Sequence, residues 1–123
     1  MTKPLDGVRI IDLSNMLMAP YATQILGDMG ADIIKVEPPV GDPIRGIGPY
    51  RNPGMGAIFM NINRSKRSIV LDLKKPDGHA AILELLKDAD VLIYNRRPKV
   101  MDRLDLSYEK LSALNPRLIY AGL

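Results

Sequence analysis

The sequence predicts an α/β domain in which crossover helices cover a mostly parallel sheet. Short runs rich in β-branched residues alternate along the chain with longer segments of helical period, which is the pattern of parallel strands joined by helices. The chain has 123 residues, of which 46% are apolar, so it can build a single core. We therefore expect one α/β domain or part of one.

Five short runs are predicted to form the strands. The first, "VRIIDL", and the second, "DIIKVE", are separated by a helical segment, so these two strands should be parallel. The predicted strands are residues 8–13, 32–37, 68–73, 90–95 and 117–123. A parallel strand needs helices over both faces and none follows the last run, so we expect an incomplete large domain. The alternative is a complete small domain that ends in a protected edge strand.

Helices are predicted between these strands, at residues 19–29, 57–64, 75–89, 98–104 and 107–115. The core face of the first helix is expected to carry the apolar residues that recur at helical spacing, namely Met18, Ala22, Ile25, Leu26 and Met29. Residues 38–56 are too rich in Pro and Gly for regular structure. A loop of that length is expected to form a lid over a site or a subunit surface.

Composition and charge argue against several classes of function. The net charge of +3 is scattered along the chain and only 5% of residues are aromatic, so nucleic-acid binding is not predicted. The absence of Cys and the presence of a single His, His79, argue against a metal site. The start "MTKPLDGVRI" lacks a signal-peptide core, and no apolar run could span a bilayer. We therefore expect a cytoplasmic protein that does not associate with membranes.

Groups that suit an anion follow three of the predicted strands. A helix begins after the first strand, "KKP" follows the third and "NRRPK" follows the fourth. Ligands of open α/β sheets bind where the carboxyl ends of the strands meet, so this pattern predicts a phosphorylated ligand. The alternative is that the basic residues only solvate the rim of the sheet. A nicotinamide dinucleotide is disfavoured, because residues 14–19 read "SNMLMA" where its Gly-rich fingerprint should lie.

Three long segments carry a family resemblance. They read "PLDGVRIIDLSNMLMAPYATQILGDMGADIIKVEPPVGDPIRGIGP", "NINRSKRSIVLDLKKPDG" and "ADVLIYNRRPKVMDRLDLSYEKLSALNPRLIY". In this order, over nearly the whole chain, they resemble the class III coenzyme A transferases of the CaiB/BaiF type. That family includes formyl-CoA transferase, crotonobetainyl-CoA:carnitine CoA-transferase and α-methylacyl-CoA racemase.

The resemblance implies that residues 1–123 are the N-terminal part of a Rossmann-like large domain, without the catalytic and small-domain segments. It implies an interlocked homodimer that uses coenzyme A or acyl-CoA as substrate and a carboxylic acid as acceptor, with no covalently bound cofactor. By the resemblance, the turn after the first strand lines the path of the pantetheine and diphosphate, and the other positions surround the adenine. The implied CoA-binding residues are Met16, Leu17, Met18, Leu71, Lys74, Asn95, Arg96 and Arg103.

The resemblance places the chemistry beyond Leu123. In the transferases an Asp carboxylate attacks the acyl-CoA thioester to give a mixed anhydride, so no catalytic residue is expected in this chain, which alone should be inactive. One open alternative is a racemase, in which a His and an Asp exchange the proton α to the thioester carbonyl. Another is a non-catalytic α/β module that binds a nucleotide or a partner chain. Formyl-CoA transferases carry a Gln where this chain has Leu17, which argues against a formyl or oxalyl substrate.

Overall fold

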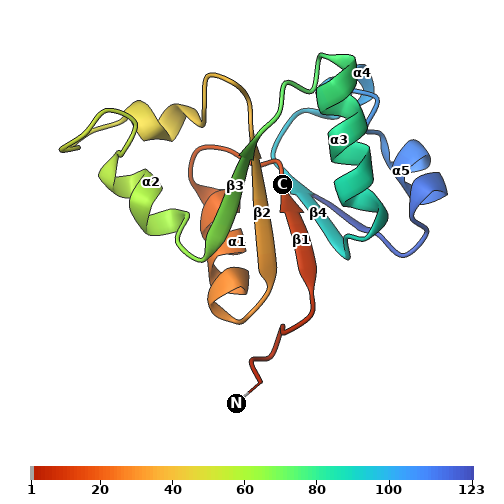
Figure 1. Cartoon of the computed structure of the whole chain (residues 1–123), viewed down its shortest axis with the longest axis horizontal. Helices are drawn as coiled ribbons and strands as arrows, with labels where there is room; N and C mark the ends of the chain where they lie inside the picture. The colour runs from red at the N-terminus through yellow and green to blue at the C-terminus, as the bar shows by residue number, and fades with distance from the viewer. Residues whose placement is uncertain (1) are drawn as a thin grey trace.

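A five-stranded sheet in which all strands are parallel forms the centre of the protein (Figure 1). The structure is a computed structural model that describes residues 2–123. The spatial order of the strands is β3-β2-β1-β4-β5, so the chain reverses its direction of winding between β1 and β4. The strands are β1 (Arg9–Asp12), β2 (Asp32–Glu37), β3 (Lys66–Val70), β4 (Val91–Tyr94) and β5 (Ile119–Gly122). The predicted α/β class and parallel sheet are confirmed.

Helices cover both faces of the sheet, as the crossover connections require. On one face lies α1, with α2 beside it, and on the other lie α3, α4 and α5 (Figure 1). The helices are α1 (Met18–Asp28), α2 (Ala57–Ile62), α3 (Pro76–Lys87), α4 (Pro98–Arg103) and α5 (Tyr108–Leu114). All five predicted helices are present. None of the helices in residues 2–123 has the length and apolar character needed to cross a membrane.

Alternate side chains of the central strands supply two cores. Ile11, Ile34 and Leu92 point toward α3, α4 and α5, where they meet Ile82 and Leu86 among other apolar side chains. Their neighbours in sequence, Ile10, Ile33 and Ile93, form a smaller cluster on the α1 side. Because both faces are buried, β1, β2 and β4 need nearly continuous apolar sequences. The carboxyl ends of all five strands are thereby held rigidly at one edge.

The predicted core face of α1 is wrong for three of its five residues. Met18, Ile25 and Met29 are 72%, 42% and 39% exposed, whereas Ala22 is half-buried and Leu26 packs against the smaller core. The fully buried side of α1 consists of small and polar residues, and Gly27 shows the reason, because a Cβ there would lie 2.9 Å from the carbonyl oxygen of Ser65. Small residues allow α1 to lie close to the sheet and to the turn before β3. The helix therefore presents most of its large apolar side chains outward.

Strand β3 also differs from its predicted range of 68–73, since it occupies Lys66–Val70. It is an edge strand whose residues are mostly exposed, so apolar pattern does not mark its start. The strand ends before Asp72, whose Oδ1 accepts a hydrogen bond from the Lys74 N–H at 3.1 Å. This side-chain turn redirects the chain toward α3.

Residues 38–56 were predicted to lack regular structure, but they contain a single 3-10 turn, η1 (Pro43–Gly46). Asp42 caps η1, because its Oδ1 accepts a hydrogen bond from the Ile44 N–H at 3.1 Å. Arg45, within η1, forms two 2.7 Å hydrogen bonds to the Glu37 carboxylate at the end of β2. The first part of the loop is thus folded back against the sheet.

The Glu37 carboxylate makes folding depend on pH. Burial alone would raise its pKa, but hydrogen bonds from Arg45, from the Asp42 N–H and from Ser68 outweigh burial and lower the pKa from 4.5 to about 2. Since the pKa is lower in the folded protein, the ionised carboxylate stabilises the fold above pH 4.5. That stabilisation, roughly 3 kcal/mol in full, is lost as pH falls from 4.5 toward 2.

We predict that Glu37→Gln lowers the free energy of unfolding near neutral pH and removes part of its decrease between pH 5 and 3. Urea denaturation over this range measures both effects. The matched control is Glu84→Gln, on an exposed part of α3, which should keep the wild-type decrease. Parallel pH curves for the wild type and Glu37→Gln would contradict this account.

Candidate functional site

Two adjoining hollows lie at the carboxyl edge of the sheet. The first, of about 80 Å³, lies between the ends of β2 and β3, with Leu71, Lys74 and Arg96 in its wall. The second, of about 400 Å³, lies between the start of α3 and the end of α4, with Arg103 and His79 in its wall. The two hollows share a wall, which consists of Leu73, Lys74 and Leu104. The second offers the larger space.

The cations around these hollows have no acidic partners. Lys74, Lys75, Arg96 and Arg103 form no ion pair with any carboxylate in residues 2–123. Three carboxylates also border the hollows. Arg45 and Lys110 neutralise Glu37 and Asp105, so Asp72 is the one acidic side chain of the two walls that forms no ion pair within residues 2–123. Positive charge therefore dominates the combined surface, which suits an anionic ligand.

Two buried polar atoms at the hollows lack hydrogen-bond partners within residues 2–123. They are Nε of Arg96, a residue that lines the first hollow, and Nε2 of His79, a residue that lines the second. Buried donors and acceptors usually have partners, so such atoms mark positions where a ligand or solvent can bind. His79 thus lies at the same surface as the unpaired cations.

The backbone of the turn between β1 and α1 is held by side chains from two other strands. The carbonyl oxygen of Ser14 accepts a 2.8 Å hydrogen bond from Lys35 Nζ, which comes from β2. Asn95, just after β4, accepts from the Asn15 N–H at 3.0 Å and donates to the Asn15 carbonyl oxygen at 2.8 Å. The turn is therefore tied to both neighbours of β1, at the point where the sheet reverses direction.

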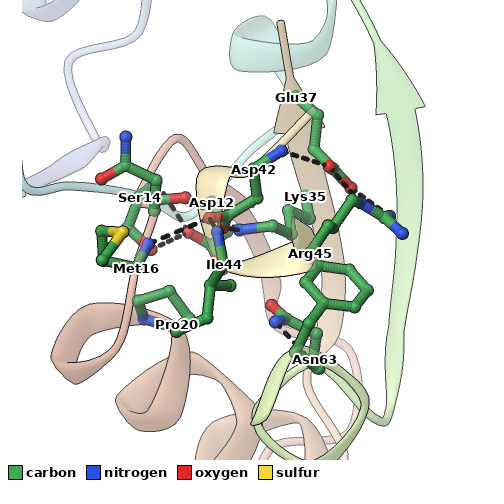
Figure 2. Close-up of polar contacts among 12 residues, drawn as sticks. Asp12, Ser14, Met16, Pro20, Lys35, Glu37, Asp42, Ile44, Arg45 and Asn63 are labelled. Atoms are coloured by element: carbon green, nitrogen blue, oxygen red, sulfur yellow. Dashed lines mark hydrogen bonds and ion pairs between the residues drawn. The ribbon is translucent and has the colours of Figure 1, made fainter. Parts of the chain in front are cut away.

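The backbone of Met16 is held by a third side chain, that of Asp42. Its N–H donates to Asp42 Oδ1 at 3.1 Å, as Figure 2 shows. Met16 has φ of +67°, a left-handed conformation that is strained for a residue with a side chain and costs on the order of 1–3 kcal/mol. The Asp42 hydrogen bond helps to offset that strain. The side chains of Met16, Leu17 and Met18 remain exposed, so a rigid backbone presents three large apolar groups.

A buried charge network lies beneath this turn. The side chains of Lys35 and Asp42 are each 1% exposed, and Lys35 Nζ lies 2.9 Å from Asp42 Oδ2 (Figure 2). Beside them, Lys66 Nζ lies 3.1 Å from Asp12 Oδ2, which also accepts a 2.6 Å hydrogen bond from Thr23. Burial lowers the pKa of Lys66 to about 8, against the attraction of Asp12.

The structure divides the predicted site residues into two groups. Leu71, Lys74, Arg96 and Arg103 line the two hollows. Met16, Leu17, Met18 and Asn95 form a second group where β1 and β4 end, and Asn95 uses its side chain to hold the turn. Arg97, next to Arg96, is exposed and lines neither hollow.

Sequence reasoning missed the residues that hold the turn from below, chiefly Lys35 and Asp42. One signal was present, because a lysine in the middle of the apolar run "DIIKVE" cannot be buried without a partner. The identity of that partner was not readable, since Asp42 lies in a segment without periodicity. Of the leucines that line the hollows, Leu71 was predicted as a CoA-binding residue, whereas Leu73 and Leu104 were assigned no role.

Within residues 2–123, no cluster of His, Cys, Asp and Glu side chains could hold a metal ion. The carboxylates of Asp12, Glu37 and Asp42 are buried and already paired with cations. With unpaired cations and leucine side chains around the hollows, the described residues form a surface that can bind an anion with an apolar portion.

Known proteins resemble this chain over nearly its whole length. The model of CoA-transferase family III matches residues 5–123. An acetyl-CoA:oxalate CoA-transferase from Acetobacter aceti is 50% identical over 120 residues, which span 97% of this chain and 31% of that protein. A succinyl-CoA:mesaconate CoA-transferase from Haloarcula hispanica is 42% identical over 123 residues, again 97% of this chain and 31% of the relative.

A solved structure shares the fold as well as the sequence. The crystal structure of a CAIB/BAIF family protein from Brucella suis superposes with a TM-score of 0.93 at 40% identity, over 99% of this chain and 33% of that one. The chain thus spans about a third of the length of the relatives it matches. A family match over residues 5–123, together with this agreement in sequence and fold, shows that the chain belongs to CoA-transferase family III.

Proposed function

We propose that the full-length protein transfers coenzyme A from an acyl-CoA to a carboxylic acid, and that residues 2–123 bind the nucleotide end of CoA. The observation that carries this proposal is the set of four unpaired cations, Lys74, Lys75, Arg96 and Arg103, around two adjoining hollows. A molecule with three phosphate groups and a purine matches a surface that combines positive charge with leucine side chains.

The individual groups suit the parts of CoA. A guanidinium can hold phosphate oxygens with two parallel hydrogen bonds and can stack on a purine, whereas lysine acts as a compact charge. Leu71 and Leu104 supply apolar walls near Arg96 and Arg103. We therefore assign the adenine and the 3′-phosphate to the hollows. The exposed side chains of Met16–Met18 then receive the pantetheine and diphosphate, and methionine adapts readily to such a flexible chain.

The chemical steps that we propose require an Asp carboxylate outside residues 2–123. That carboxylate attacks the thioester carbonyl, the C–S bond breaks, and a mixed anhydride and CoA thiolate form. The thiolate then attacks the aspartyl carbonyl, which releases the donor acid and leaves CoA as a thioester of the enzyme. The acceptor carboxylate attacks that thioester, which gives a second mixed anhydride and releases the CoA thiolate again. The thiolate then attacks the acceptor's carbonyl, so the acceptor leaves as its CoA thioester and the Asp carboxylate is regenerated. The described chain binds and orients CoA, and by itself is inactive.

Transfer is favoured over the two alternatives. The relatives described above carry transferase names, which supports transfer over α-proton exchange by a racemase. The unpaired cations and the hydrogen-bonded turn after β1 favour a CoA-binding part of an enzyme over a non-catalytic α/β module, because the fold alone requires neither feature. Leu17 argues against oxalate as acceptor, yet the 50% identical relative is named for oxalate, so oxalate belongs among the acids to be tested.

We also propose a cytoplasmic, interlocked homodimer. The exposed apolar side of α1, which includes Met18, Ile25 and Met29, supports a covered surface in the functional protein. The lack of Cys fits a reducing compartment.

Adjacent arginines test the assignment of the nucleotide site. We expect the full-length protein to bind CoA in calorimetric titrations, and Arg96→Ala and Arg103→Ala each to weaken that binding by about tenfold or more, because each removes a phosphate contact. Arg97→Ala is the matched control, since it removes the same charge one residue away from the hollow. Equal losses for Arg96→Ala and Arg97→Ala would exclude a specific role for Arg96.

The reaction class can be tested with the same protein. Acetyl-CoA or succinyl-CoA incubated with oxalate or mesaconate should yield the acceptor's CoA thioester, detected by chromatography. Hydroxylamine should inactivate the enzyme only when acyl-CoA is present, because it traps an activated aspartyl group. Solvent deuterium entering the α position of a 2-methylacyl-CoA, without exchange of CoA between acids, would instead establish the racemase.

Oligomeric state provides an independent test. An interlocked dimer cannot separate without unfolding, so sedimentation velocity should give a dimer over a wide range of dilution. A monomer at low concentration would contradict interlocking.

A further inference from the structure

We infer that Asp42 is a positioning residue for CoA, acting through the backbone of Met16 and supported by Lys35. This inference rests on the function proposed above, because its effect is exerted on the Met16–Met18 turn. Asp42 acts on the backbone of the turn rather than on the side chains of Met16, Leu17 and Met18, because its carboxylate accepts a hydrogen bond from the Met16 N–H.

The two oxygens of the Asp42 carboxylate have distinct roles. Oδ1 accepts hydrogen bonds from the N–H groups of Met16 and Ile44, both at 3.1 Å. Oδ2 accepts no hydrogen bond within residues 2–123, but it lies 2.9 Å from Lys35 Nζ in an ion pair. One carboxylate therefore joins the turn after β1, the start of η1 and the centre of β2 (Figure 2).

Lys35 and Asp42 hold the two ends of the same short turn. Lys35 Nζ donates to the carbonyl oxygen of Ser14 at 2.8 Å, and Asp42 accepts from Met16. The position of Asp42 is itself set, because its N–H donates to Glu37 Oε2 at 2.9 Å. The left-handed conformation of Met16 is thus fixed by a chain of contacts that starts in the sheet.

A purely structural role for the pair would not require this geometry. Buried ion pairs can often be replaced by apolar side chains without loss of stability, so burial alone does not explain the pair. The specific feature is that Oδ1 accepts from a peptide group of the turn that presents Met16, Leu17 and Met18. Loss of that acceptor should release the turn while leaving the hollows around Arg96 and Arg103 unchanged.

Two double variants separate positioning from stability. Lys35→Met with Asp42→Asn removes both buried charges and keeps a side-chain oxygen that can accept from Met16. Lys35→Met with Asp42→Leu also removes both charges, but it has no acceptor. Asn and Leu are similar in size, so the two proteins differ chiefly in the hydrogen bonds that the side-chain oxygen accepts from the N–H groups of Met16 and Ile44. Urea denaturation of the full-length proteins verifies that both are folded.

The readout is the affinity for CoA compared with that for adenosine 3′,5′-bisphosphate, which lacks the pantetheine. We expect the Asp42→Leu double variant to bind CoA about tenfold more weakly than the wild type, while the Asp42→Asn double variant recovers most of that loss. Both should bind adenosine 3′,5′-bisphosphate within about threefold of the wild type, because the hollows are intact.

The possible failures are distinguishable. A wild-type protein that does not bind CoA overturns the proposed function, and this inference with it. A wild type that binds CoA, with two double variants of equal CoA affinity, overturns only the role of Asp42. Equal losses for CoA and for adenosine 3′,5′-bisphosphate in the Asp42→Leu double variant also overturn it, because they indicate a general disturbance of the fold. If the Asp42→Leu protein does not fold, Asp42→Ala with Lys35→Met replaces it as a variant without an acceptor, and unchanged CoA affinity there contradicts the inference.

Discussion

A lysine buried in the middle of a parallel sheet imposes the central constraint on this structure. Lys35 cannot be left without partners at 1% exposure, and it finds them in Asp42 and in the carbonyl oxygen of Ser14. Those two partners belong to different connections, one after β2 and one after β1. The need to satisfy one ammonium group therefore draws two loops together at the carboxyl edge of the sheet.

The charges at this edge fall into two classes that differ in their partners. Inside, Asp12, Lys35 and Asp42 belong to buried ion pairs, which hold backbone in place. Outside, Arg96 and Arg103 border the hollows and have no acidic partner in the part of the chain that the structure describes. The inner class accounts for shape and the outer class for attraction of an anion. Both classes lie at the carboxyl edge of the strands, where ligands of open parallel sheets bind.

The sequence predicted the order of the elements, since strands buried on both faces and helices with proline in the first turn leave clear local patterns. Sequence-based prediction failed where tertiary contacts determine the structure. Met18, Ile25 and Met29 of α1 face outward because Gly27 needs close contact with Ser65, a relation that α1 alone does not reveal. Strand β3 begins at Lys66, which looks like a loop residue until its buried contact with Asp12 is known. Asp42 gave no signal because its partners are distant in sequence or belong to the backbone.

Three observations support the proposal that this part of the protein binds the nucleotide end of CoA. They are the membership of CoA-transferase family III, the unpaired cations around the hollows and the hydrogen-bonded turn after β1. The most direct measurement is a crystal structure of the full-length protein with CoA bound. We expect the adenine and the 3′-phosphate in the hollows, with that phosphate within hydrogen-bonding distance of Arg96 or Arg103, and the diphosphate and pantetheine along Met16–Met18. CoA bound at another surface, with both hollows filled only by solvent, would contradict the account.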